Sequence, residues 1–403
     1  MRIQRPLVPL LTIVLTLVAL GGLSADTGAM HQVSQARPIS LGTSGGNIYD
    51  RSTAWCCSGT LGAMVTNNSG VPHQYILSNN HVLARTNAGT IGDPIIQPGL
   101  IDQSPVCAQD TTDTVGYLSK FNTILFTKGT TNVVDGAIAQ VATNLSVSPQ
   151  ILDIPALSGT ATPEKINMPV QKSGRTTGLT TGVVAAVSVT ISVRYGSTCG
   201  GGRGTATFTN QIRITPGSFS AGGDSGSLIA TVPPSGTAAS AVGLLFAGSS
   251  SDTFANPVSS VLSTFGVSLV GYTSTAATSP TRWLADRIRR ISAPAAAHAG
   301  TPHGAPVDPQ SQAHVTQVKE RHEAALMATP GVVGVGVGAS DVTPGEAVIE
   351  VYVEHSSRAV RSAIPTRLED VPVRIVETGE VVARVDACRL DARAAVARPT
   401  TAH

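Results

Sequence analysis

Apolar residues recur along most of the chain in short runs bounded by turn-forming residues, which is the pattern of β-strands. The runs are rich in Val, Ile, Leu and Thr, and Gly, Asn, Pro and Ser separate them at short intervals. Such spacing favours an antiparallel barrel or sandwich over alternating strands and helices. We therefore expect a mainly β domain over residues 30–278, with strands at 59–66, 74–78, 133–141, 182–194, 205–214 and 241–247.

The pattern changes towards the C-terminus, where a helical period appears beside alternating strands. Val315, Val318 and Leu326 fall near one face of a predicted helix. Two strands with a short helix between them follow. We expect a small α+β domain over residues 311–395, with these elements at 312–328, 347–354, 358–364 and 371–377.

A change in charge marks the boundary between these two parts. From Met30 to Tyr272 the only glutamate is Glu164, whereas residues after 279 carry many more charges. Residues 279–310 are rich in Ala, Pro, His and Gly and form a predicted linker. The linker begins with a short basic amphipathic segment around Trp283, for which packing on a domain and contact with a membrane surface are both open.

The first 29 residues have the organisation of a secretory signal. Arg2 and Arg5 form a basic start, residues 7–20 are apolar, and small residues follow through Ala29. The apolar run is short for a membrane span and suits a cleaved signal. We expect residues 1–29 to be a signal peptide and the protein to be secreted or extracytoplasmic, without a membrane span after cleavage; a retained anchor is the alternative.

Composition and motifs exclude several classes of function. A net charge of +2 gives no electrostatic footprint for nucleic acid. One glutamate in the whole β domain argues against glycoside hydrolysis by paired carboxylates. The glycine strings at 199–204 and 331–338 lack the features of phosphate and dinucleotide loops. Neither Cys-x-x-Cys nor His-Glu-x-x-His occurs, so no metal and no cofactor are expected.

A serine in a glycine-rich turn is the first candidate for chemistry. Ser225 lies in the string Gly223-Asp224-Ser225-Gly226. A serine hydroxyl needs a neighbouring base to become a nucleophile, and acyl transfer also needs N–H donors aimed at the developing oxyanion. Glycines around Ser225 permit a sharp turn that directs the Gly223 and Ser225 amides the same way.

A base and an orienting acid are available in the same domain. His81 stands where the apolar run 75–77 meets a polar turn. Asp135 opens another apolar strand, where a buried carboxylate is costly unless it has a partner such as a histidine. Asp113, in a comparable position, is the alternative orienting acid.

Taken together, these residues resemble the chymotrypsin-like serine endopeptidases. The order His–Asp–Ser with Gly-Asp-Ser-Gly is similar to that family, and most similar to its secreted bacterial branch of streptogrisins and alpha-lytic protease. In that branch a Ser-Gly-x-Thr-Thr-Gly turn precedes a long hairpin, and here it occupies residues 173–178. The resemblance covers about residues 55–270. It implies two six-stranded antiparallel β-barrels, at about 55–150 and 165–270, with the active site in the cleft between them.

The resemblance assigns roles by position. Ser225 would be the nucleophile, His81 the general base and acid, and Asp135 the orienting carboxylate, with the Gly223 and Ser225 amides as the oxyanion hole. The substrate backbone would pair with one wall of the primary pocket, formed by Phe246, Ala247 and Gly248. The opposite wall would be formed by Phe219, Ser220 and Ala221. Neither wall offers a carboxylate or a cation, so small or apolar residues before the cut bond are expected.

Two further expectations concern the support of this site. The bacterial branch pairs the acid beside its nucleophile with a basic side chain of the preceding turn, so we expect an ion pair between Lys172 and Asp224. The family usually places a serine where Phe246 stands, and its hydroxyl helps to hold the catalytic aspartate. Its absence leaves the support of Asp135 unexplained.

The cysteines suit an exported protein. Cys56, Cys57, Cys107 and Cys199 are disulfide candidates in the β domain, and Cys388 lies in the tail. We prefer a bridge from Cys56 or Cys57 to Cys107, without choosing between the two.

The sequence thus predicts a secreted serine endopeptidase that acts on protein or peptide substrates. The alternative is a catalytically inactive binding or adhesion protein on a protease fold. For the C-terminal domain three roles stay open, namely recruitment of substrate, attachment to an unidentified partner, and occlusion of the cleft.

Overall fold

The computed structural model describes residues 29–68, 70–196, 203–273, 305–384 and 386–389. Residues 1–28 of the predicted signal peptide, and residues 279–304 of the predicted linker with its basic amphipathic segment, lie outside these ranges. Within the described ranges, no helix is long and apolar enough to cross a membrane.

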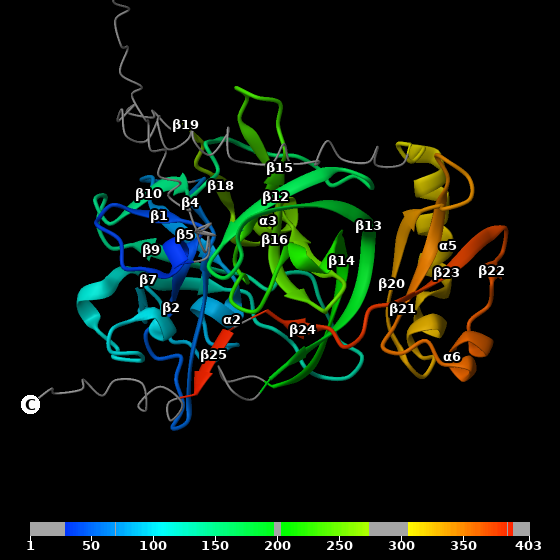
Figure 1. The fold of residues 1–403 in the computed structure, drawn as a ribbon, viewed down its shortest axis with the longest axis horizontal. Coiled ribbons are helices and arrows are strands. Elements are labelled where there is room, and N and C mark those ends of the chain that lie inside the picture. Colours follow the sequence, from blue (N-terminus) through cyan, green and yellow to red (C-terminus); the bar gives the residue numbers. More distant parts are fainter. Residues whose placement is uncertain (1–28, 69, 197–202, 274–304, 385, 390–403) are drawn as a thin grey trace, which may run out of the picture.

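The N-terminal part of the chain forms a nine-stranded sheet whose neighbours are all antiparallel (Figure 1). In spatial order its strands are β18 (Val267–Leu269), β4 (Ala63–Asn67), β5 (Gln74–Ser78), β9 (Ala137–Val141), β7 (Thr114–Phe121), β6 (Pro94–Ile96), β2 (Thr43–Asn47), β3 (Trp55–Leu61) and β25 (Asp386–Arg389). Alternate residues such as Ile76 and Leu118 point into one apolar core. Beside this sheet β1 (Ile39–Leu41) pairs with β10 (Val147–Ile151).

The second sheet has fourteen strands and continues into the C-terminal part of the chain. Its main path is β22 (Arg367–Leu368), β23 (Val371–Glu377), β21 (Ala347–Val353), β20 (Val332–Ala339), β13 (Gly178–Tyr195), β12 (Pro169–Gly174), β15 (Leu228–Thr231), β16 (Ala239–Gly248), β17 (Thr253–Pro257), β14 (Gly204–Thr215) and β8 (Thr131–Asn132). Off this path lie β11 (Ala156–Ala161), β19 (Tyr272–Thr273) and β24 (Val382–Ala383). Because β13 also pairs with β14, the six strands β12 to β17 form a closed ring.

The protein is therefore mainly β, as expected, and the helices within the described residues are few and mostly short. They are α1 (Ala29–Gln32), α2 (Asn80–Leu83), α3 (Val258–Phe265), α5 (Pro309–Met327) and α6 (Arg358–Ala363), with 3₁₀ turns η1 (Leu100–Asp102), η2 (Thr111–Asp113) and η3 (Gly217–Phe219). The ring β12 to β17 has six strands, and the expected presence of two such barrels in the chain remains a prediction.

Residues 305–377, here called the C-terminal module, pack onto the outer edge of β13 (Figure 1). Helix α5 begins after Asp308, whose carboxylate accepts hydrogen bonds from two backbone amides of the first turn. Its buried Val315, Val318 and Leu326 lie in a core shared with β20 and β21. The parallel pair β21 and β23, linked through α6, completes the module.

Charged contacts also join the module to the rest of the molecule. Arg213 of β14 binds Asp252 at 2.7 Å and Glu350 of β21 at 2.9 Å, and both carboxylates are buried. Lys319 of α5 donates to the Ser188 carbonyl of β13 at 2.7 Å. A buried carboxylate is strongly destabilising once its partner is removed, so these contacts tie the module tightly to β13 and β14.

The glycine string at 331–338, which was not expected to be a strand, forms β20. Gly334, Gly336 and Gly338 point to one face of it, and a Cβ on Gly336 would collide with the Tyr352 hydroxyl. The glycines allow two buried strands to approach closely around that ring, although glycine itself is a poor strand former.

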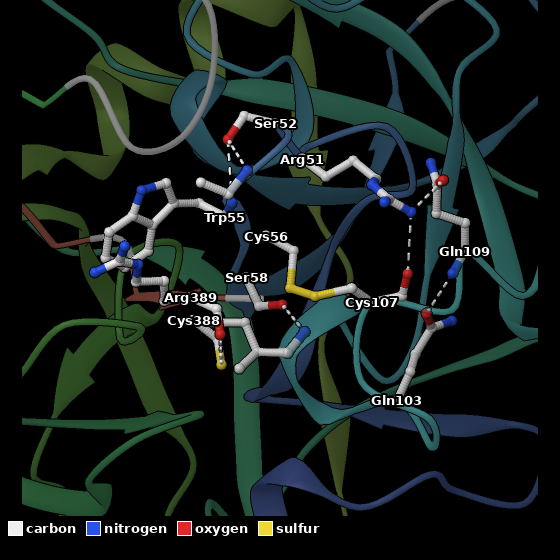
Figure 2. Close-up of a disulfide and its surroundings, with 12 residues drawn as sticks. Arg51, Ser52, Trp55, Cys56, Ser58, Gln103, Cys107, Gln109, Cys388 and Arg389 are labelled. Atoms are coloured by element: carbon white, nitrogen blue, oxygen red, sulfur yellow. Dashed lines mark hydrogen bonds between the residues drawn. A yellow bond between two sulfur atoms is a disulfide. The ribbon is translucent and has the colours of Figure 1, made fainter. Parts of the chain in front are cut away.

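One disulfide joins Cys56 of β3 to Cys107 in the loop after η1 (Figure 2). The expected bridge to Cys107 is confirmed, with Cys56 as the partner. Cys57 is also disulfide-bonded, and Cys199 lies outside the described residues. Cys388 of β25 is a free thiol.

Candidate active site

His81 lies in α2, immediately after the buried strand β5, and only 2% of its surface is exposed. Its Nδ1 is 2.5 Å from Asp135 Oδ2, and its backbone amide donates to Asp135 Oδ1 at 3.3 Å. A neutral imidazole that donates through Nδ1 keeps Nε2 as an acceptor. Nε2 is buried and has no hydrogen-bond partner among the described residues, so it is free to take a proton.

Asp135 precedes β9 and is completely buried. Its backbone is fixed on both sides, because its amide donates to Asn256 at 3.1 Å and its carbonyl accepts from Asn79 at 2.7 Å. These contacts hold the carboxylate against His81. Asp113, the alternative acid, lies in η2 and accepts from Gln103 at 2.9 Å; no contact of Asp113 with His81 is found in the described part of the chain.

Tyr195, at the end of β13, is a site residue that sequence reasoning missed. Its hydroxyl donates to Asp135 Oδ2 at 2.7 Å, and its ring meets His81 edge-on at 5.9 Å. Burial, and then the charge of Asp135, raise the pKa of Tyr195 well above its ordinary value, so the hydroxyl keeps its proton. Tyr195 thus supplies the donor that Phe246 cannot. No feature of the local sequence pointed to this contact.

Ser225 lies in the loop between η3 and β15 and is completely buried. Its hydroxyl donates to the Phe246 carbonyl at 3.1 Å, and its own carbonyl accepts from Thr60 N at 2.8 Å. The structure thus brings His81 and Asp135 into direct contact, whereas the hydroxyl of Ser225 is bonded to Phe246. Between the described residues, no hydrogen bond joins it to His81.

The amides of Gly223 and Ser225 converge on one point. Both donate to a single carbonyl oxygen, that of Arg384, at 2.6 and 3.4 Å. Gly223 has a φ of +93°, which an L side chain rarely adopts. Two N–H groups aimed at one oxygen form the arrangement that stabilises a tetrahedral oxyanion.

Asp224, between these two amides, faces away into a second buried polar cluster. Lys172 Nζ is 3.5 Å from its Oδ2, and both side chains are fully buried. The carboxylate also accepts from the amides of Thr176, Thr177 and Ala221 at 2.9, 3.2 and 2.9 Å. Burial lowers the pKa of Lys172, and Asp224 partly offsets this.

The residues expected to line the primary pocket differ in their surroundings. The Phe219 ring is buried 6.0 Å from Lys172 Nζ, and the buried Ser220 hydroxyl is bonded to Thr253 at 2.7 Å. The Phe246 ring packs on Phe208. Ala247 and Gly248 pair through their backbones with β24. The Ala221 amide donates to Asp224 Oδ2 at 2.9 Å, and its carbonyl accepts from the Asp224 amide at 3.2 Å.

No group of three or more His, Cys, Asp or Glu side chains suited to a metal ion occurs among the residues that the structure describes.

Comparison with solved structures finds bacterial serine proteases. A glutamic acid-specific serine protease is 21% identical and covers 58% of this chain and 100% of its own, with a TM-score of 0.38. A Nocardiopsis protease and Thermobifida fusca protease A are 18% and 19% identical, cover 55% and 57% of this chain and 98% of their own, and both have a TM-score of 0.35. No protein-family model and no curated protein matches the chain. Likeness at this level does not identify a function, so function is inferred from the chain's own contacts.

Proposed function

We propose that the protein is a secreted serine endopeptidase that cuts peptide bonds through an acyl-enzyme on Ser225. The observation that carries the proposal is the convergence of the Gly223 and Ser225 amides on one carbonyl oxygen, beside a buried His81–Asp135 pair at 2.5 Å. A glycine-rich structural turn alone would not need both features in one place.

In the proposed reaction, Ser225 Oγ attacks the carbonyl carbon of the substrate while His81 Nε2 takes its proton. Asp135 stabilises the imidazolium that forms, and the Gly223 and Ser225 amides stabilise the oxyanion. His81 then gives the proton to the leaving amine. In the second half of the reaction, water attacks the acyl carbon while His81 Nε2 takes its proton. His81 then returns the proton to Ser225 Oγ as the ester bond breaks.

The hydroxyl of Ser225 must leave Phe246 before it can transfer its proton. In the structure it donates to the Phe246 carbonyl, and Nε2 of His81 lacks a partner within the described residues. Rotation about the Cα–Cβ bond of Ser225 would exchange one acceptor for the other. The unsatisfied Nε2 favours this exchange, because a buried acceptor without a donor is costly.

The primary pocket supports the expected preference for small or apolar residues before the cut bond. Phe219 and Ser220 are buried, and the nearby carboxylate of Asp224 is already occupied by Lys172 and three amides. None of the described residues assigned to the two walls carries a carboxylate that could receive a basic side chain from the substrate.

Labelling with a fluorophosphonate probe tests the proposal directly, since the probe reacts with an activated serine. We expect the chain to be labelled slowly, because its own Arg384 carbonyl occupies the Gly223 and Ser225 amides, and a Ser225→Ala chain to remain unlabelled. An Arg384→Pro chain is labelled in parallel. Proline lacks the N–H that binds the Phe246 carbonyl, so this substitution should free the two amides from the carbonyl of residue 384. If no form reacts, the protein is the alternative, a catalytically inactive binder with a protease fold.

A further inference from the structure

The segment that follows the C-terminal module returns across the molecule and pairs with both sheets beside the candidate site (Figure 1). Val382 and Ala383 of β24 pair antiparallel with Gly248 and Ala247 of β16. Four residues of β25 pair antiparallel with β3, in the register Asp386 to Ser58 through Arg389 to Trp55. One short stretch of chain therefore bridges the two sheets on either side of Ser225.

The backbone of Arg384 lies between these two pairings and meets the reacting groups. Its amide donates to the Phe246 carbonyl at 3.1 Å. Its carbonyl oxygen accepts from Gly223 and Ser225 at 2.6 and 3.4 Å. A carbonyl held by both oxyanion donors exposes its carbon to the adjacent serine, which is the position of a peptide about to be cut.

We propose that the chain is its own substrate: residues 382–384 and 386–389 occupy the cleft as the two sides of a peptide substrate would, and Ser225 cuts the bond that follows Arg384. This inference rests on the proposed function and adds to it the identity of one substrate and the bond that is cut.

Side chains on both sides of the bond anchor the segment. Asp386 pairs with Arg175 at 2.7 Å, and Arg175 is itself held by both oxygens of Asp102. Arg389 lies over the Trp55 ring at 6.0 Å (Figure 2). The guanidinium of Arg384 donates to the Ser249 carbonyl. Contacts on both sides fix which carbonyl reaches the oxyanion donors.

The C-terminal module delivers the segment to this place. Strand β20 pairs with β13 over residues 186–191, and the buried Arg213–Glu350 pair fixes β21 to β14. Only a few residues separate Glu377, the last of β23, from β24. A tether this short makes binding of the segment intramolecular and raises its effective concentration far above that of a free peptide.

The covalent step balances without any further reagent than water. Ser225 Oγ bonds to the Arg384 carbonyl carbon, and its proton passes to His81. The bond to the nitrogen of Val385 then breaks, and that nitrogen receives the proton from His81. Hydrolysis of the ester leaves a carboxylate on Arg384, a new amino terminus on Val385 and an unchanged Ser225.

Cutting this bond does not by itself clear the cleft. Strand β24 lies before the cut and keeps its pairing with β16 and β13. The new Arg384 carboxylate stays near the Gly223 and Ser225 amides, which favour an anion. The cut chain is therefore expected to remain inhibited by its own product, in agreement with occlusion as the role of this part of the chain.

The experiment is mass spectrometry of the purified full chain over time, beside Ser225→Ala and Arg384→Pro chains. We expect the wild type to yield a chain that ends at Arg384 and the peptide 385–403, and both variants to stay intact. Arg384→Pro removes the N–H that binds Phe246 and should raise turnover of an added peptide at least about tenfold over the wild type. Arg358→Pro, at the exposed first position of α6, is the matched control and should behave as the wild type.

Failure of this inference differs from failure of the proposed function. If Arg384→Pro reacts with the fluorophosphonate probe while the wild type is never cut after Arg384, self-cleavage is wrong and the endopeptidase stands. If Arg384→Pro is folded by circular dichroism yet neither reacts nor cuts any peptide, both are wrong. Cutting that persists in Ser225→Ala would assign the cleavage to a contaminating protease and overturn the inference.

Discussion

Asp135 and Asp224 are both completely buried, yet their partners differ in kind. Asp135 accepts from His81 and Tyr195, and neither is a permanent cation. Asp224 pairs with Lys172 and accepts three backbone amides as well. The first carboxylate is thus placed to meet a positive charge that appears only when His81 takes a proton. The second is neutralised from the start and holds a loop in shape.

In the proposed enzyme, one type of side chain would thus serve catalysis at Asp135 and support the fold at Asp224. A buried carboxylate with a fixed cation and several amides is already stabilised in its charged form, whereas one with only neutral donors is stabilised further when a cation forms beside it. Four predictions test this contrast. In the first and the third, turnover is measured in the Arg384→Pro background, where we expect the cleft to be open.

Asp135→Asn should have the largest effect on turnover. The amide cannot stabilise an imidazolium and can reverse the tautomer of His81, so kcat should fall about 10⁴-fold while the fold is kept. Steady-state kinetics with circular dichroism measures both. The matched control is Asp113→Asn, which should leave kcat within about twofold; equal losses in the two variants would contradict the assignment of Asp135.

Lys172→Met should act on stability first. It leaves Asp224 buried without its cation, and breaking such a pair costs about 3–5 kcal/mol of the free energy of unfolding. Denaturant titration measures the loss. Lys165→Met changes an exposed lysine and should have little effect. A Lys172→Met chain as stable as the wild type would show that the amides alone hold Asp224.

Tyr195→Phe should lower kcat about tenfold, because it removes one hydrogen bond to the carboxylate of Asp135. As a positioning residue, Tyr195 should change kcat and the pH profile of kcat with little change in KM. The exposed Tyr117 provides the control Tyr117→Phe. A loss confined to KM would contradict a role of Tyr195 in holding Asp135.

The smallest effect concerns Arg384 itself, whose Nε is buried without a hydrogen-bond partner in the described residues. Burial lowers the pKa of Arg384, and the charge of Asp224 only partly offsets this. In the otherwise wild-type chain, Arg384→Leu should therefore speed self-cleavage several-fold, while the exposed Arg361→Leu should not. Slower cleavage of Arg384→Leu would instead indicate a preference for arginine and contradict the expected small or apolar preference.

Much of the strand pattern could be predicted from the sequence, because alternating apolar residues record burial on one face of a sheet. The strands at 74–78 and 371–377 were predicted to the residue, and the helix expected at 312–328 begins three residues earlier, at the Pro309 that follows the Asp308 cap. The cost of burying a lone acid suggested a histidine partner for Asp135 and kept Asp113 as the alternative, and in the structure Asp135 contacts His81.

The remaining features depend on contacts between distant parts of the chain. Tyr195 reaches Asp135 from the end of a long hairpin, 60 residues away, and its sequence neighbourhood carries no sign of this. Strand β20 is rich in glycine because Tyr352 packs against it, which only the fold reveals. The segment 382–389 lacks an apolar period in its sequence, and its residues 382–383 and 386–389 become strands by pairing with edges more than 130 residues away.

The pairing of β13 with β20 also bears on solubility. Along residues 186–191 the module covers the only side of this eighteen-residue strand that β14 leaves open. Removing the module would bare a row of peptide N–H and C=O groups, which readily recruits a neighbouring molecule into a growing intermolecular sheet. A chain without its C-terminal module would thus tend to polymerise through this strand edge.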